Sequence, residues 1–505
     1  MLFKIWYNTN MKKLTNIFIA VFSLSFCLTA CSNVPTVDDP TINEDENKND
    51  SENNNDETSN ETTSEISLDY GDDNFNEFFA PQSNISLTLN FTNQSLFKLA
   101  KYGASNDFEK EEMYHPVNVE LKLNDKIFTF DEVGARMKGN TSRYDGFINE
   151  NGNFTDKERV CHFKLAFDKA FESSSDNDYY FHNYTQDELD ARDKRRLFGM
   201  KKIDLKRNRN YDSSFTKELY SLYAFREENV ISQHANLINV TINTENDSLT
   251  KQYLAYEVID KTMIKSVFKN KNDQKGDLYK CTYSSSGPAD LSTSDSNKIG
   301  VEKSGFKPSY DLKTNEDTSD HSSLKTFIDK LSKRNIPAEE IKKEFDNYLD
   351  VDYFLRFAAM SWVVGSPDDY RNNYNNYYLY FASESNKAYF IPYDNDRVFG
   401  ILKDWPIDTS LQKMCSDRLQ GTATSDGCGN PLVRRLISPG SSTRPIIEEY
   451  KKKYENYATM YAKKYLDIQK YKDFNKSYTL HNEDISGGND NMSFENYAKN
   501  KLSTL

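Results

Sequence analysis

Acidic and carboxamide side chains follow one another in a fixed order over a short stretch of the chain. Residues 368–376 carry two aspartates and four asparagines, an apolar stretch comes next, and Asp394 and Asp396 close the series. In metal-assisted phosphoryl transfer, one carboxylate accepts the proton of the attacking hydroxyl, while an asparagine and a later carboxylate hold magnesium at the phosphates. The stretch offers candidates for all three tasks, so its order of residues indicates this chemistry.

Hydrophobic periodicity predicts the elements that must position these side chains. Alternating or apolar segments predict strands at 85–91, 117–130, 162–167, 202–205, 237–242, 252–259, 377–381 and 388–392. Helical spacing predicts helices at 213–228, 323–333, 338–348, 352–364, 431–437 and 445–465. Residues 136–143 are expected to form a polar turn, and 270–320 a polar connecting region. Strands first and helices later predict an α+β fold with a sheet-rich part ahead of a helical one.

Length and charge limit the classes of protein to which the chain can belong. Its 505 residues suffice for one large two-lobed domain or two to three ordinary ones. The net charge is −14, and residues 32–68 contribute eleven acids against one lysine. The remainder is weakly acidic and lacks the basic face that nucleic-acid binding requires. No His-Glu-x-x-His motif is present, which argues against a zinc enzyme.

The first seventy residues have the composition of an export signal followed by a tether. A basic start at Met11-Lys12-Lys13 precedes an apolar run from Ile17 to Leu28, which is too short for a stable span, and a small-residue site ending in Cys31. This pattern is typical of a bacterial lipoprotein signal. We expect residues 1–30 to be removed, Cys31 to carry lipid, and residues 31–70 to form a disordered acidic tether. The expected location is extracytoplasmic, at a membrane or the cell surface.

Four further cysteines leave the redox state open. They are Cys161, Cys281, Cys415 and Cys428. Export permits disulfides, and Cys415 with Cys428 is the closest pair in sequence. Free buried thiols are an equally good interpretation, since spacing alone does not supply the distance between two sulfur atoms.

Six blocks between Ile85 and Tyr465 resemble, in order, the spore coat protein H (CotH) kinase family. The blocks are Arg136-x-Lys138-Gly139-Asn140-Thr141-Ser142, Phe163-Lys164-Leu165-x-Phe167-Asp168, Leu197-Phe198-Gly199-Met200-Lys201, Asp350-Val351-Asp352-x-Phe354-Leu355-Arg356, Asn375-Asn376-Tyr377-Tyr378-Leu379-Tyr380 and Ile391-Pro392-Tyr393-Asp394-x-Asp396-Arg397-x-Phe399-Gly400. The resemblance implies an atypical protein-kinase-like, two-lobed fold that uses ATP with Mg²⁺ or Mn²⁺ to phosphorylate serines of partner proteins. It implies a kinase domain at 71–470, with an N-lobe at about 80–260, a C-lobe at about 261–470 and a C-terminal extension at 471–505.

The same resemblance implies roles for individual residues. Lys164 would contact nucleotide phosphates and Glu218 would hold it by an ion pair. Asp368 would be the catalytic acid/base. The metal ligands would be Asp394 with Asn376 or Asn373, and Asp396 would make a further metal or phosphate contact. The turn at 136–143 is not a glycine-rich loop, so phosphates would be bound there by Lys138, Asn140 and Ser142.

Simpler interpretations stand beside these roles. Lys164 lies on an alternating strand, where a lysine normally faces solvent. Family members usually have a bulky residue before the catalytic aspartate, whereas Pro367 stands here, and a second aspartate follows Asp368. Either Asp368 or Asp369 can be the acting residue, and both can instead cap a turn.

Three classes of function therefore follow from the sequence. The first is an ATP- and magnesium-dependent serine/threonine kinase that acts on secreted or surface proteins. The second is a non-catalytic adhesion or scaffold module on the same fold. The third is a glycosyltransferase built around Asp394-x-Asp396, or a nucleotidyltransferase that uses the same site. All three predict a protein partner or a small nucleotide ligand, and none predicts a nucleic-acid partner.

Overall fold

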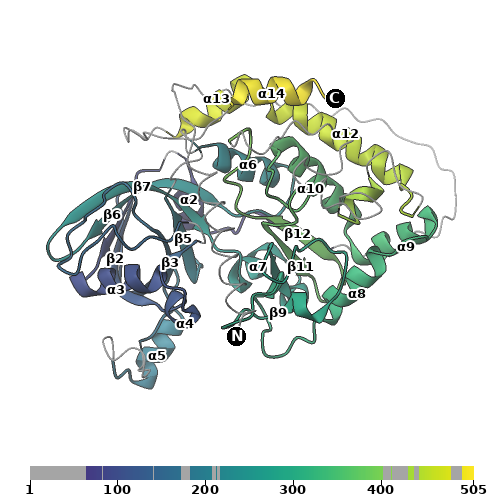
Figure 1. The fold of residues 1–505 in the computed structure, drawn as a ribbon. Helices are drawn as coiled ribbons and strands as arrows, with labels where there is room; N and C mark the ends of the chain where they lie inside the picture. Colours follow the sequence, from purple (N-terminus) through teal and green to yellow (C-terminus); the bar gives the residue numbers. More distant parts are fainter. Residues whose placement is uncertain are drawn as a thin grey trace, which may run out of the picture.

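The computed structural model describes residues 64–81, 83–139, 142–171, 182–207, 212, 216–401, 411, 430–436, 443–478 and 492–505. Within these ranges the fold is α+β, as the sequence predicts. Two hydrophobic cores organise it, one inside a β-barrel and one in a helix-rich part that lies beside the barrel (Figure 1). No helix in the described ranges is both long enough and apolar enough to cross a membrane.

Seven strands close the barrel in the order β1-β2-β3-β4-β5-β7-β6. Strands β6 and β1 pair in parallel, and every other neighbouring pair is antiparallel. The strands are β1 Ile85–Asn90, β2 His115–Leu123, β3 Lys126–Lys138, β4 His162–Ala166, β5 Lys202–Lys206, β6 Ala235–Asn243 and β7 Ser248–Glu257. Short helices accompany them: α2 Asp73–Phe79, α3 Asn93–Gly103, α4 Phe108–Glu111 and α5 Gln186–Asp193.

The helix-rich part is built around a five-stranded sheet of order β12-β11-β8-β10-β9. Its strands are β8 Leu278–Cys281, β9 Ile299–Gly300, β10 Tyr310–Leu312, β11 Tyr377–Phe381 and β12 Ala388–Pro392. Its helices are α7 Lys261–Val267, α8 Ser322–Leu331, α9 Ala338–Tyr348, α10 Val351–Val364, α12 Glu448–Tyr465, α13 Ile468–Ser477 and α14 Phe494–Leu502. Three 3₁₀ turns complete it, η1 Asp273–Lys275, η2 Ser296–Lys298 and η3 Val433–Arg435.

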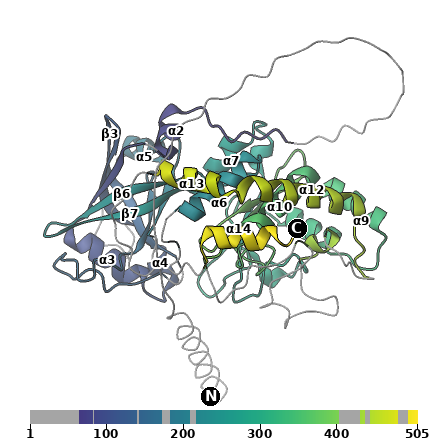
Figure 2. The ribbon, with the colours of Figure 1, turned by 90° about the horizontal axis from the view of Figure 1, so that it is seen from above.

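Helix α10 is the centre of the helix-rich core. Eleven of its fourteen residues are buried, which is the pattern of a helix covered on all sides. It begins with Asp350, whose side chain accepts a hydrogen bond from the backbone N–H of Tyr353, and it ends at Gly365 in the left-handed conformation. Helix α12 packs along it, and Figure 2 shows α12, α13 and α14 on the same side of the molecule.

Helix α6, Thr216–Glu227, links the two parts. It follows β5 of the barrel in sequence, but its Tyr220, Ala224 and Phe225 belong to the helix-rich core. Its Leu219 and Leu222 pack instead with side chains of β6 and β7. Because α6 is buried on both sides, it fixes one end of the junction between the barrel and the helix-rich part.

The segment before α2 also joins both parts. The backbone N–H of Ser67 donates to the carbonyl of Val267 at 2.8 Å, and that of Lys269 donates to the carbonyl of Glu65 at 3.1 Å. Further along, the Tyr70 hydroxyl donates to Glu257 at the end of β7, at 3.3 Å. The chain therefore crosses the junction before it enters the barrel.

The structure corrects several of the predicted elements. Residues 117–130 are two strands, β2 and β3, and β3 continues through Lys138, so the first three of the eight residues in the predicted turn at 136–143 are strand. The polar region at 270–320 contributes β8, β9 and β10 to the second sheet. These strands are only two to four residues long, too short to show a period in sequence.

Candidate active site

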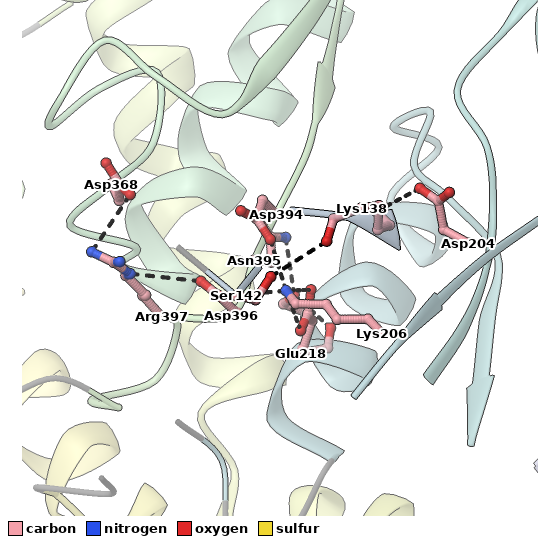
Figure 3. A network of polar contacts seen from close by, with 11 residues as sticks. Lys138, Ser142, Asp204, Lys206, Glu218, Asp368, Asp394, Asn395, Asp396 and Arg397 are labelled. Atoms are coloured by element: carbon pink, nitrogen blue, oxygen red, sulfur yellow. Dashed lines mark hydrogen bonds and ion pairs between the residues drawn. The ribbon is translucent and has the colours of Figure 1, made fainter. Parts of the chain in front are cut away.

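Lys206 is the centre of a cluster at the junction between the barrel and the helix-rich part. On β5 the side chains of Ile203 and Leu205 belong to the barrel core, so Asp204 and Lys206 alternate to its outer face. The Lys206 ammonium contacts three carboxylates: Nζ lies 2.7 Å from Asp394 Oδ1, 3.2 Å from Glu218 Oε1 and 3.3 Å from Asp396 Oδ2. Figure 3 shows these side chains converging from the barrel, α6 and the segment after β12.

The pKa values in this cluster reflect a shortage of positive charge. Burial raises the pKa of Glu218 to about 7, because Lys206 offsets only part of the cost and Asp396 adds repulsion. Burial and then the charge of Asp394 raise the pKa of Asp396. Burial also acts against ionisation of Asp394, but Lys206 outweighs it and holds the pKa of that carboxyl well below its usual range. Asp394 therefore stays ionised.

The β11–β12 hairpin positions the two aspartates. Tyr377 pairs with Pro392 at its open end, and the backbone N–H of Tyr393 donates to the carbonyl of Asn376 at 3.2 Å. Asp394 then adopts a φ of +53°, in the left-handed region that Asp tolerates better than most residues. The side chain of Asp394 is 39% exposed, the most open of the four acids in the cluster, so it is available to a ligand.

Asp368 joins the cluster through Arg397. Nη1 of Arg397 lies 3.6 Å from Asp368 Oδ2, and Nε lies 3.7 Å from Asp396 Oδ1. The other oxygen of Asp368 accepts hydrogen bonds from the side-chain amides of Asn373 at 2.5 Å and Asn375 at 3.1 Å. Asp368 is thus oriented by two carboxamides and one guanidinium, as an acid/base residue with a fixed position would be.

Asp369 has a different task. Its Oδ1 accepts the backbone N–H groups of Arg371 at 3.0 Å and Asn372 at 2.8 Å, so it caps the turn. Its Oδ2 is buried and has no hydrogen-bond partner among the described residues. Burial raises the pKa of Asp369 to about 7. Of the two aspartates that the sequence left open, Asp368 faces the cluster and Asp369 supports the backbone.

A second group of charges lies on the barrel side of the junction. Asp204 is almost fully buried, and its carboxylate contacts Lys138 Nζ at 2.6 Å and Lys164 Nζ at 3.0 Å. Burial resists ionisation of Asp204, but the two lysines outweigh it and hold its pKa well below the usual range. The side chains of Lys138 and Lys164 are each 16% exposed, so both are mostly buried at the junction.

The prediction of an ion pair between Lys164 and Glu218 is wrong. Glu218 pairs with Lys206 on the next strand, and Lys164 pairs with Asp204, its cross-strand neighbour in the register of β4 and β5. Of the two asparagines predicted as metal ligands, Asn373 donates to Asp368, and the backbone carbonyl of Asn376 accepts from Tyr393. Asn375, which was not predicted, also donates to Asp368. The hydroxyl of Ser142 donates to the carbonyl of Lys138 at 3.5 Å.

Some predicted positions lie outside the described ranges: Cys31, Asn140, Cys415 and Cys428. Cys161 and Cys281 are both buried, and the thiol of Cys281 is free.

Sequence reasoning missed Lys206, Asp204 and Arg397 as members of the site. Lys206 and Asp204 carried a signal, because Lys202 to Lys206 alternates strictly between charged and apolar residues. This pattern is the same as that of a strand whose charged face is exposed to solvent. Only the tertiary contacts show that the two charged side chains belong to the site.

The acids of the Lys206 cluster fit a divalent cation. Four carboxylates, those of Glu218, Asp368, Asp394 and Asp396, share two cationic side chains, Lys206 and Arg397. No group of three or more His, Cys, Asp or Glu residues in the described ranges forms a ready metal cage. Mg²⁺ does not require one, since it is usually held by one or two carboxylates together with water and substrate phosphates. Asp394 and Asp396 supply the oxygen ligands that it prefers.

The site thus joins carboxylates from two packed parts of the fold to one lysine, beside an aspartate oriented by carboxamides and an arginine. The profile of the family described as CotH kinase protein matches residues 170–482, which is more than half of the chain. The chain belongs to the CotH kinase family. The match contains Lys206, Glu218, Asp368 and Asp394, whereas Lys138 and Lys164 precede it. No curated protein matches the chain.

Proposed function

We propose that the protein is an ATP- and magnesium-dependent protein kinase that transfers the γ-phosphoryl group of ATP to serine or threonine hydroxyls of secreted or cell-surface proteins. The observation that carries the proposal is the contact of Lys206 with Glu218 and Asp394 across the junction. Family membership supports kinase-like chemistry in general, and the geometry supports this particular reaction.

In this proposal the barrel is the N-lobe and the helix-rich part is the C-lobe of an atypical kinase-like fold. Lys206 and Glu218 form the ion pair that keeps the lobes in register, and the nucleotide lies along the junction between them. Asp394 and Asp396, with Asn373 or Asn376, would hold Mg²⁺ or Mn²⁺, which would neutralise charge on the phosphates when bound. Lys138 and Lys164 contact the phosphate oxygens from the barrel side.

Asp368 has the chemical task in the transfer. Its carboxylate accepts the proton of the acceptor hydroxyl, whose oxygen forms a bond to the γ-phosphorus while the bond from that phosphorus to the bridging oxygen of ADP breaks. The products are a phosphorylated side chain and ADP. Arg397, between Asp368 and Asp396, is in position to stabilise negative charge on the phosphoryl group in transit.

The expected export signal places this activity outside the cytoplasm, with lipid on Cys31 as the membrane anchor. The acidic residues 31–70 then act as a tether between the membrane and the kinase.

The proposal is tested with the full chain purified in detergent, γ-labelled ATP, Mg²⁺ and a serine-rich acceptor protein. Label transfer is expected for the wild type and for Asp125→Asn, an exposed control on the β2–β3 turn. It should be lost in Asp368→Asn and in Asp394→Asn. Transfer from α-labelled ATP would instead indicate a nucleotidyltransferase, and metal-dependent hydrolysis of a nucleotide sugar would indicate a glycosyltransferase. No nucleotide binding at all would favour the adhesion or scaffold module.

A further inference from the structure

Lys280 on β8 brings a third lysine to the junction, from the side of the helix-rich part. Its Nζ lies 5.2 Å from the centroid of the Tyr393 ring, and Nζ of Lys138, from the barrel, lies 6.0 Å from the same centroid. Two positive charges from opposite parts of the fold therefore approach one aromatic ring.

Lys280 has no acidic partner within ion-pair distance in the part of the chain that the structure describes. Asp311 is its neighbour across the β8–β10 pair, but the Asp311 carboxylate is paired with Lys313. Lys138 and Lys164 share the single carboxylate of Asp204. The group of three lysines and one acid thus carries two positive charges in excess. A contact with a ring face offsets only a small part of such repulsion.

The neighbouring Lys206 cluster has the opposite imbalance. There four carboxylates share two cations, so two negative charges are in excess when all four are ionised. Tyr393 precedes Asp394 directly, which places the two groups side by side along the junction. A polyanion combined with a divalent cation has complementary charge to this pair of groups, and the phosphate chain of a nucleoside triphosphate with Mg²⁺ is such a ligand.

We propose that Lys280 completes a triphosphate-binding site with Lys138 and Lys164, and that Asp204 is its positioning residue. The site takes the phosphate chain of a nucleotide, with two ammonium groups supplied by the barrel and one by the helix-rich part. Asp204 holds Lys138 and Lys164 at a fixed separation on the barrel wall, and Lys280 closes the site from the other side. The identity of the ligand as a nucleotide rests on the proposed function; the site for a chain of phosphates does not.

Calorimetry on the full chain with tripolyphosphate and with AMP, each in the presence of Mg²⁺, tests the site. Loss of one charge-assisted contact to phosphate should weaken tripolyphosphate binding about tenfold in Lys280→Met. Binding of AMP, which lacks the β- and γ-phosphates, should change less than twofold. Lys280→Arg should restore most of the affinity, and Lys122→Met, an exposed lysine of β2, should bind as the wild type does.

Asp204→Asn separates positioning from charge. The substitution removes a negative charge and so increases the excess of positive charge. A site that depended on charge alone would therefore bind tripolyphosphate at least as tightly as before. If Asp204 positions the two lysines, the preference of the variant for tripolyphosphate over AMP should fall about tenfold. The thermal unfolding midpoint of the ligand-free variant serves as the control that it is folded.

The outcomes distinguish this site from the kinase proposal. Unchanged tripolyphosphate affinity in Lys280→Met, or no tripolyphosphate binding by the wild type, overturns the site even if phosphate transfer from ATP is observed. Lys280-dependent binding of tripolyphosphate without any phosphate transfer supports the site and removes the kinase proposal.

Discussion

The Lys206 ammonium lies 2.7 Å from Oδ1 of Asp394, although the two residues are separated by 188 positions in sequence. Lys206 is on the barrel and Asp394 follows the last strand of the second sheet, so this contact crosses the junction. The same ammonium reaches Glu218 on α6. One lysine therefore connects three elements that must keep their positions for Asp394 to face a ligand.

Lys206→Met should lower phosphate transfer by about 100-fold, the typical cost of removing one preorganised charged group from a site of this kind. The removal leaves three carboxylates without their shared cation, so binding of Mg²⁺ and nucleotide should weaken together. Steady-state kinetics with varied ATP measures the effect. Lys202→Met, four residues earlier on β5, is the matched control and should retain activity; an equal loss in that variant would refute the special role of Lys206.

Asp368 and Asp369 should respond in opposite ways to substitution by alanine. Asp369→Ala leaves two backbone N–H groups of the turn without their acceptor and should destabilise the protein by about 1–3 kcal/mol. Asp368→Ala should abolish transfer with a smaller effect on stability. Urea unfolding followed by fluorescence, together with transfer assays on both variants, separates the two effects. A stable but inactive Asp369→Ala would reverse the assignment.

The pH dependence of stability should carry the signature of Asp369. Its pKa is about 7 in the folded state because of burial, against 3.8 as the ordinary value. Between these two values the folded state holds a proton that the unfolded state has released, so the contribution of Asp369 to stability decreases as pH rises from about 4 to about 7. Asp369→Asn cannot ionise. The wild type should therefore lose stability relative to this variant between pH 5 and pH 8, as measured by urea titrations at each pH; a constant difference contradicts the assignment.

Cys161 and Cys281 should be inert in the folded protein. Both side chains are fully buried, and burial raises the pKa of the Cys281 thiol well above its usual value, which suppresses the reactive thiolate. Iodoacetamide should label neither residue in native buffer and both in 6 M guanidinium chloride, as peptide mass spectrometry will show. Equal labelling under both conditions would place these thiols at the surface.

Lipid attachment at Cys31 is expected from the signal-like start of the chain. Radiolabelled palmitate should be incorporated into the wild type in a bacterial host and not into Cys31→Ala. Membrane association should be lost in the same variant. Persistent labelling of Cys31→Ala would exclude the proposed anchor.

The sequence by itself determined the features that depend on near neighbours. The limits of α9, β11 and β12 were predicted to the residue. Helix α9 has a clear apolar period, and β11 and β12 are short apolar and aromatic runs between polar residues, which is typical of fully buried strands. The order of acids and carboxamides from Asp368 to Asp396 likewise needed no structure to suggest phosphoryl transfer, and family membership supports that general class.

Only the tertiary structure decided which charges meet. Strand register made Asp204 the neighbour of Lys164, and barrel closure with the packing of α6 brought Lys206 to Glu218. Such pairings join residues far apart in the chain, and a lysine on a half-exposed strand has the same local pattern whether it faces solvent or a catalytic acid. The different surroundings of Asp368 and Asp369 have the same origin, since adjacent residues in a turn are distinguished only by the backbone groups and side chains that the fold brings to them.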